Sequence, residues 1–255
     1  MTAIIAPYGG YRKMLSFGFT CLAYHATETF CARNFDYRND PLGKTVGQMV
    51  GAARSARQNL VEASSRAGTS AETELRLLDV AKASLQELAG DYEAYLLGRH
   101  AAPWSETAPG AEAFRALRFE PFVPDGGDAR HAFGVHFLRM RERFAPVLEP
   151  EDPEAAANGI LLCIDRASAL LRRQMEKTAE TFTQAGGFTE RMSRARIEAR
   201  DAERAPAADG GEKNAPPCPK CGGPMRRVLA KKGRNAGKPF WGCRKWPECD
   251  GTRAE

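Results

Sequence analysis

The sequence predicts an all-α body followed by a small β module at the C-terminus. The body is expected to be an antiparallel four-helix bundle with a long insertion, because apolar residues recur at spacings of three and four along several segments. Near the C-terminus this helical period stops, and four cysteines fall in two close pairs. We therefore expect a helical domain at 1–204, a flexible linker at 205–217 and a separate module at 218–255.

Four long helices are expected, at 11–38, 45–67, 70–98 and 153–185. The third has the clearest pattern, a seam of alternating three- and four-residue spacings that suits bundle packing. The seam consists of Leu78, Ala81, Leu85, Leu88, Tyr92 and Tyr95. Thr69 or Ser70 is the expected N-cap of this helix.

The segment at 99–153 breaks this rhythm with several prolines and the Gly126–Gly127 pair. We interpret it as a long crossover connection, with a short helix at 128–144, that returns the chain to the bundle. A charged extension at 188–204 interleaves both signs of charge. It is typical of a solvated helix with i,i+4 ion pairs, and a nucleic-acid contact is the alternative.

The positive charge of the chain is concentrated in the module. The formal net charge is +5, and residues 218–255 hold ten Lys or Arg against three Asp or Glu. A polyanion is therefore the expected partner of the module.

No apolar stretch is long enough to span a membrane and no signal peptide is evident, so we expect a cytoplasmic chain without a membrane partner. In that compartment Cys21, Cys31 and Cys163 are expected to be reduced, buried thiols.

The spacing of the last four cysteines predicts a metal site. Two residues separate Cys218 from Cys221, and five separate Cys243 from Cys249. Two pairs of thiolates on separate tight turns are what one tetrahedral zinc ion requires, and four thiolates leave no open position for catalysis. We expect one structural Zn²⁺, with a short β-hairpin between the pairs and its tip at 233–237. A redox Cys-x-x-Cys is the alternative, but no βαβ pattern surrounds these residues.

Basic and aromatic residues surround the cysteines and form the candidate nucleic-acid-binding set. They are Arg226, Arg227, Lys231, Lys232, Arg234, Lys238, Phe240, Trp241, Arg244, Lys245 and Trp246. Cations can follow the phosphates of a strand, while exposed aromatic rings stack on its bases. We expect Phe240 to be the more buried ring, and Trp241 and Trp246 to be the more exposed. The alternatives are that the rings only pack against the zinc turns, or that the module contacts a protein.

The module resembles a known family. The segments CPKCGGPM and GKPFWGCRKWPEC are similar to the C-terminal zinc ribbon, a C4-type zinc finger, of bacterial type IA DNA topoisomerases. The resemblance covers about 216–253. It implies binding of single-stranded DNA, and no chemistry by the ribbon itself.

The body also resembles a family, through QMVGAARSARQNLVEASS and ELRLLDVAKASLQELAGDYEAYL. These runs are similar to four-helix bundle proteins related to 23S rRNA intervening-sequence proteins and to the accessory variability determinant (Avd) of diversity-generating retroelements. The matching residues are Arg54, Ser55, Asn59, Glu62, Ser84, Leu85, Glu87 and Leu88. The resemblance implies a homo-oligomer, in this family a ring-like pentamer. It also suggests a reverse transcriptase, or another nucleic-acid enzyme, as a partner.

Nothing in the sequence indicates an enzyme. It contains no P-loop, no Gly-x-Gly-x-x-Gly and no Ser/His/Asp set, and its four histidines lie without suitable partner spacing. The polar residues of the second and third helices are expected to pair across the bundle or a subunit interface rather than to contact a substrate. The leading hypothesis is thus a non-catalytic nucleic-acid-binding adaptor. The alternatives are a protein-interaction scaffold or accessory factor, and a non-catalytic subunit of a topoisomerase-like complex.

Overall fold

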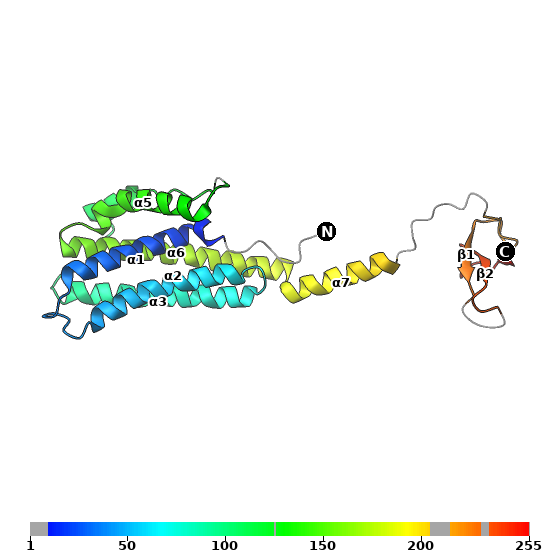
Figure 1. The fold of residues 1–255 in the computed structure, drawn as a ribbon, viewed down its shortest axis with the longest axis horizontal. Coiled ribbons are helices and arrows are strands. Elements are labelled where there is room, and N and C mark those ends of the chain that lie inside the picture. Colours follow the sequence, from blue (N-terminus) through cyan, green and yellow to red (C-terminus); the bar gives the residue numbers. More distant parts are fainter. Residues whose placement is uncertain (1–9, 125, 205–214, 231–234, 255) are drawn as a thin grey trace. The chain divides into compact units, whose positions relative to one another are not determined.

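The structure, a computed structural model, describes residues 10–124, 126–204, 215–230 and 235–254 (Figure 1). It is mostly helical, with six helices packed together and a small three-stranded antiparallel sheet near the C-terminus. The chain divides into two compact units, Met1–Ala195 and Arg196–Glu255. None of the described helices is both long enough and apolar enough to cross a membrane. Most of the expected linker at 205–217 lies outside the described residues.

The first unit is organised around four long helices, each of which contacts two others of the four. They are α1 (Leu15–Asn34), α2 (Lys44–Arg66), α3 (Ala71–Leu97) and α6 (Pro153–Ala185). The expected seam of α3 lies in the core, and Tyr92 inside it donates a hydrogen bond to Thr27 Oγ1 on α1 (3.0 Å). Ser70 is the N-cap of α3, because its hydroxyl accepts a hydrogen bond from the Thr73 N–H at 3.1 Å.

The first helix is shorter than expected at both ends. A 3₁₀ turn, η1 (Tyr11–Lys13), precedes it, and Met14 between the two has an extended backbone. At the other end the side-chain amide of Asn39 donates to the Asn34 carbonyl (2.8 Å), which ends the helix in a polar turn. The expected range of 11–38 was therefore wrong by four residues at each end.

The insertion at 99–153 is not a simple connection, and this corrects the sequence interpretation. It forms two helices, α4 (Pro109–Ala116) and α5 (Ala129–Leu148), in place of one short helix at 128–144. Their apolar side chains lie in the same core as the long helices, and α5 lies alongside α1 and α6 (Figure 1). This second layer explains why α1 buries side chains on every face rather than along one stripe.

Close backbone approach fixes the end of α5 against α6. A Cβ atom at Gly159 on α6 would lie 2.0 Å from the carbonyl oxygen of Val147, so only glycine allows this contact.

The three isolated thiols are buried as expected, with Cys21, Cys31 and Cys163 at most 4% exposed. Burial raises the pKa of Cys21 to about 12, which keeps this thiol protonated and unreactive.

A seventh helix, α7 (Phe188–Arg204), occupies the range of the charged extension. It begins after Gly186, whose positive φ of 73° ends α6. Most of its described side chains are exposed.

Candidate metal centre

The second unit contains a three-stranded antiparallel sheet rather than the expected two-stranded hairpin. The strands are β1 (Met225–Leu229), β2 (Pro239–Cys243) and β3 (Thr252–Ala254), in that spatial order. The third strand forms because the chain returns after the last cysteine, where the Cys243 N–H donates to the Gly251 carbonyl at 2.9 Å. Part of the expected hairpin tip, at 231–234, lies outside the described residues.

The four C-terminal cysteines converge on one point. Their sulfur atoms all lie within 4.8 Å of one another. Cys218 Sγ is 3.8 Å from Cys249 Sγ, and Cys221 Sγ is 3.5 Å from Cys243 Sγ. Sulfur atoms around a tetrahedral zinc ion, at a zinc–sulfur distance of about 2.3 Å, are about 3.8 Å apart. These separations are too long for disulfides and fit a shared metal ion.

Two tight turns present the sulfur atoms. In the first turn the Gly222 N–H donates to the Cys218 carbonyl (2.9 Å), and Gly222 has a φ of +69°, which glycine adopts without strain. In the second turn the Lys245 N–H points at Cys243 Sγ (3.4 Å) and the Cys249 N–H donates to the Lys245 carbonyl (3.0 Å). Backbone N–H groups aimed at sulfur in this way orient a metal-binding thiolate and stabilise its charge.

Backbone N–H groups of the first turn also favour the thiolate form of Cys218. The backbone N–H of Cys221, and to a lesser degree that of Lys220, lower the pKa of Cys218 to about 7. At Cys243 and Cys249, the backbone hydrogen bonds are outweighed by desolvation and the neighbouring thiols, which raises the pKa of Cys243 to about 12 and also raises that of Cys249. A metal ligand has to be deprotonated, so an ion would have to displace protons from these two thiols. Exposure differs among the four, because Cys218 and Cys243 are buried while Cys221 is exposed.

Gly251, which follows the second cysteine turn, leaves room for the sulfur atoms. A Cβ atom at Gly251 would lie 2.2 Å from Cys218 Sγ and 3.5 Å from Cys249 Sγ. Gly251 directly precedes β3, so the strand that completes the sheet also closes the metal site.

The sheet separates the aromatic residues of the candidate nucleic-acid-binding set. Trp241 is half-buried and packs against the cluster of Cys218, Met225 and Cys243, which corrects the expectation that it is an exposed ring. Phe240 is also half-buried, but it lies on the opposite face of the sheet because adjacent residues of a strand alternate. Trp246 is 64% exposed, as expected.

The basic residues of that set are likewise distributed over the module. Arg226 and Arg227 are exposed on opposite faces of β1, Lys238 precedes β2, and Arg244 and Lys245 lie in the second cysteine turn. The remaining candidates, Lys231, Lys232 and Arg234, lie outside the described residues.

The candidate set left out two basic residues of the module: Lys220, which pairs with Asp250 at 2.7 Å, and Arg253. Arg253 lies on β3 directly opposite Trp241. The signal was weak, because Arg253 follows the last cysteine and nothing in the sequence indicated a third strand.

In the body, the polar set divides into a paired group and an exposed group. Ser84 on α3 donates to Ser55 Oγ on α2 (3.1 Å), and the Asn59 amide donates to the Ser55 carbonyl (2.9 Å). The expected pairing across helices is thus seen for Ser84 and Ser55, whereas Asn59 bonds within α2. The charged members, Arg54, Glu62 and Glu87, are exposed.

A scan against protein-family models, a search of curated proteins and a search of solved structures each returned no match for the chain. The structure therefore defines a helical body followed by a β module with a cluster of four cysteines that could hold a metal ion.

Proposed function

We propose that this chain is a non-catalytic nucleic-acid-binding adaptor. In this proposal α1, α2, α3 and α6 form a four-helix bundle, and the β module is a zinc ribbon that binds single-stranded DNA or RNA. A tetrahedral set of four thiolates is typical of structural zinc sites, in which the ion has no catalytic role. The ion would hold together a module whose described core consists of only a few side chains.

The observation that carries the proposal is a row of side chains across the sheet. Arg227 on β1 pairs with Trp241 on β2, which pairs with Arg253 on β3. Residues directly opposite each other in antiparallel strands share a face, with Cβ atoms about 4.5–5.5 Å apart. Trp241 therefore has an arginine on each neighbouring strand, on the face that also carries Cys243.

Such a row matches the chemistry of a single strand. A base can stack on the half-exposed indole, while the flanking arginines contact the phosphates before and after it. Because every base has a flat face, this mode of binding tolerates any sequence. Trp246 in the second cysteine turn offers a second exposed ring beside the cations Arg244 and Lys245.

The body would multiply this binding. The resemblance of α2 and α3 to bundle proteins that form pentamers supports a homo-oligomer, which would display several ribbons. Ribbons joined in this way bind one strand with a higher avidity than any of them alone, through their effective concentration.

A fluorescence anisotropy titration with a labelled single-stranded oligonucleotide at two salt concentrations tests the proposal. Trp241→Ala is expected to weaken binding by about 1–3 kcal/mol, the usual contribution of one stacked base. Arg253→Ala is expected to lower the slope of log K against log salt by about 0.7, the value for one phosphate contact on a single strand. The matched control is Arg76→Ala on α3, an exposed arginine of the body that pairs with Glu72 and should not change the slope.

The zinc content of every variant is measured in parallel, because Trp241 also packs against the sulfur cluster. Absence of binding by the zinc-loaded chain at low salt would sink the proposal. If Arg253→Ala and Arg76→Ala have equal slopes of log K against log salt, the row of Arg227, Trp241 and Arg253 is not the binding surface.

A protein partner is the second candidate, and exposed apolar side chains on the insertion favour it. Val123, Val135 and Leu138 are 80%, 56% and 57% exposed, and a cavity of about 560 Å³ lies between the segment at 121–123 and α5. A reverse transcriptase or another nucleic-acid enzyme would bind this apolar surface, and its affinity would depend little on the salt concentration. Val135→Asp would abolish that binding and leave oligonucleotide binding unchanged.

A further inference from the structure

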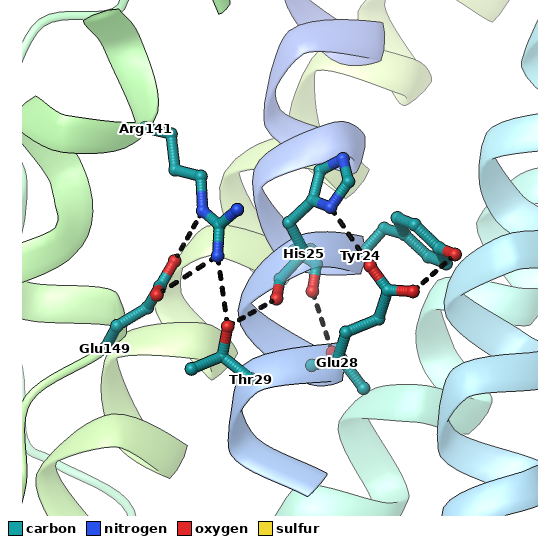
Figure 2. Close-up of polar contacts among 8 residues, drawn as sticks. Tyr24, His25, Glu28, Thr29, Arg141 and Glu149 are labelled. Atoms are coloured by element: carbon teal, nitrogen blue, oxygen red, sulfur yellow. Dashed lines mark hydrogen bonds and ion pairs between the residues drawn. The ribbon is translucent and has the colours of Figure 1, made fainter. Parts of the chain in front are cut away.

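The inner side of α5 is held against α1 by polar and aromatic contacts (Figure 2). Arg141 on α5 donates to both oxygens of Glu149 (2.9 and 3.2 Å) and to Thr29 Oγ1 on α1 (3.1 Å). One turn earlier on α1, the His25 ring centre lies 5.4 Å from that of Phe137 on α5. These contacts fix the position of α5 and leave its opposite side uncovered in the described part of the chain.

The uncovered side of α5 carries an apolar surface beside a cavity. Val135 and Leu138 on α5 are 56% and 57% exposed, and Val123 in the preceding segment is 80% exposed. The cavity has a volume of about 560 Å³, and Phe122, Val123 and Val135 are among its lining residues. This volume falls in the range of ligand pockets, about 300–1,000 Å³. Exposed apolar side chains grouped around one cavity mark a surface that another segment or molecule covers.

A series of aromatic rings connects this cavity to the first described residues of the chain. The Phe122 ring centre lies 5.4 Å from that of Phe133 on α5, which in turn lies 5.9 Å from that of Phe17 on α1. Tyr11 in η1 packs edge-on against Phe17 at 4.8 Å, and the Arg12 guanidinium lies 5.9 Å from the Phe133 ring centre. The residues that precede η1 therefore begin close to the aromatic side of the cavity.

The segment at 1–9, which lies outside the described residues, has a composition that suits an apolar cavity. It reads MTAIIAPYG, contains no charged side chain and has two adjacent isoleucines, Ile4 and Ile5. Nine extended residues span up to about 30 Å, which is enough to reach across the cavity from η1. Because the segment is tethered, its effective concentration at the cavity is high.

A second cavity near the start of α1 suits this segment less well. Its volume is about 250 Å³, and Gln174 in its lining accepts a hydrogen bond from the Ser16 hydroxyl at 3.0 Å. Glu74, Lys177 and Arg191 also line it. An uncharged segment bound there would desolvate these charged groups and offer them no ion pair.

We propose that the segment at 1–9 binds in the cavity beside α5, where Ile4 and Ile5 cover Val123 and Val135. The chain then buries this apolar surface against its own residues. A protein partner that uses the same surface has to displace the segment before it binds. The inference requires neither zinc nor a partner, so it stands or falls independently of nucleic-acid binding by the β module.

Methyl NMR spectra of the full chain test this arrangement directly. The chain contains only five isoleucines, so Ile4→Val and Ile5→Val assign the two relevant δ1 methyl signals. Nuclear Overhauser effects are expected between these methyl groups and those of Val123, which Val123→Ala assigns. If neither isoleucine shows such an effect to Val123, Val135 or Leu138, the proposal is overturned.

A matched pair of valine substitutions localises the contact. Val135→Asp places a charge in the lining of the cavity and should abolish the Overhauser effects between the two isoleucines and Val123. Val80→Asp places the same charge on α3, at a valine that is 47% exposed, and should leave these effects unchanged. Both valines are exposed, so neither substitution is expected to unfold the chain. Equal results for the two variants would overturn the proposal.

A sample that mixes isotope-labelled and unlabelled chains separates contacts within one chain from contacts between copies. The proposal predicts that the Overhauser effects to Val123 arise within the labelled chain. Effects that arise only between labelled and unlabelled chains would overturn it, because the segment would then cover the cavity of a second copy. Effects from Ile4 and Ile5 to Thr178 or Thr181, which line the second cavity, would overturn it as well.

Discussion

Replacing Gly251 with alanine tests the geometry of the metal centre at a residue that is not a ligand. The added Cβ atom would lie 2.2 Å from Cys218 Sγ, whereas unstrained contacts of carbon are about 3.5–4.0 Å. The sulfur or the strand would therefore have to move by about 1.3 Å or more. Metal–ligand distances tolerate deviations of only about 0.2 Å. We expect the substitution to displace one of four ligands.

The expected cost is at least about 100-fold in zinc affinity, since changes in outer-shell partners alone cost about 10- to 100-fold. That factor corresponds to about 2.7 kcal/mol. Zinc bound per chain is measured by atomic emission after dialysis, and affinity is measured by competition with a chromophoric chelator.

Gly242→Ala on β2 is the matched control for this substitution. A Cβ atom there meets only Val228 at 3.4 Å and Phe240 at 3.8 Å, which are ordinary contacts. It should bind zinc within a few-fold of the wild type. If Gly251→Ala retains the zinc affinity of Gly242→Ala, the sulfur cluster as described does not hold the metal.

Two further predictions concern the helical body. Phe144→Ala on α5 removes a fully buried ring and should lower the free energy of unfolding by about 3–5 kcal/mol in denaturant titrations, whereas Leu138→Ala, which is 57% exposed on the same helix, should change it by less than about 0.5 kcal/mol. Equal effects would mean that the insertion is not part of the core. Because the folded pKa of His25 is lowered, the folded chain binds fewer protons at this site than the unfolded chain, so stability should fall as pH drops through the ordinary histidine pKa of 6.5. Thermal melts of His25→Gln should show a weaker decline over that window, and an identical decline would contradict the assigned burial of the ring.

Local signals made parts of this fold predictable. The ends of α3 were expected within one residue because a Ser70 cap and a regular apolar seam are both properties of short sequence windows. The cluster of four cysteines was predictable for the same reason, because the spacing within each cysteine pair reflects a single tight turn.

Features that depend on distant contacts were not predictable in this way. Phe114 and Phe144 complete the core only because α4 and α5 pack on α1 and α6, and their proline-rich surroundings suggested a loop. A signal was present in α1, whose apolar residues lie on all faces and require a second covering layer. Arg253 likewise gains its role from its cross-strand neighbour Trp241.

The most direct test of the adaptor proposal measures whether nucleic-acid binding depends on zinc. The full chain, loaded with zinc, is titrated against a labelled single-stranded oligonucleotide, and the titration is repeated with Cys249→Ser after chelation. The account predicts salt-sensitive binding by the zinc-loaded chain and a loss of at least about tenfold in affinity, or about 1.4 kcal/mol, without the metal. Equal affinity of the two samples would contradict it, because binding would then not require the folded β module.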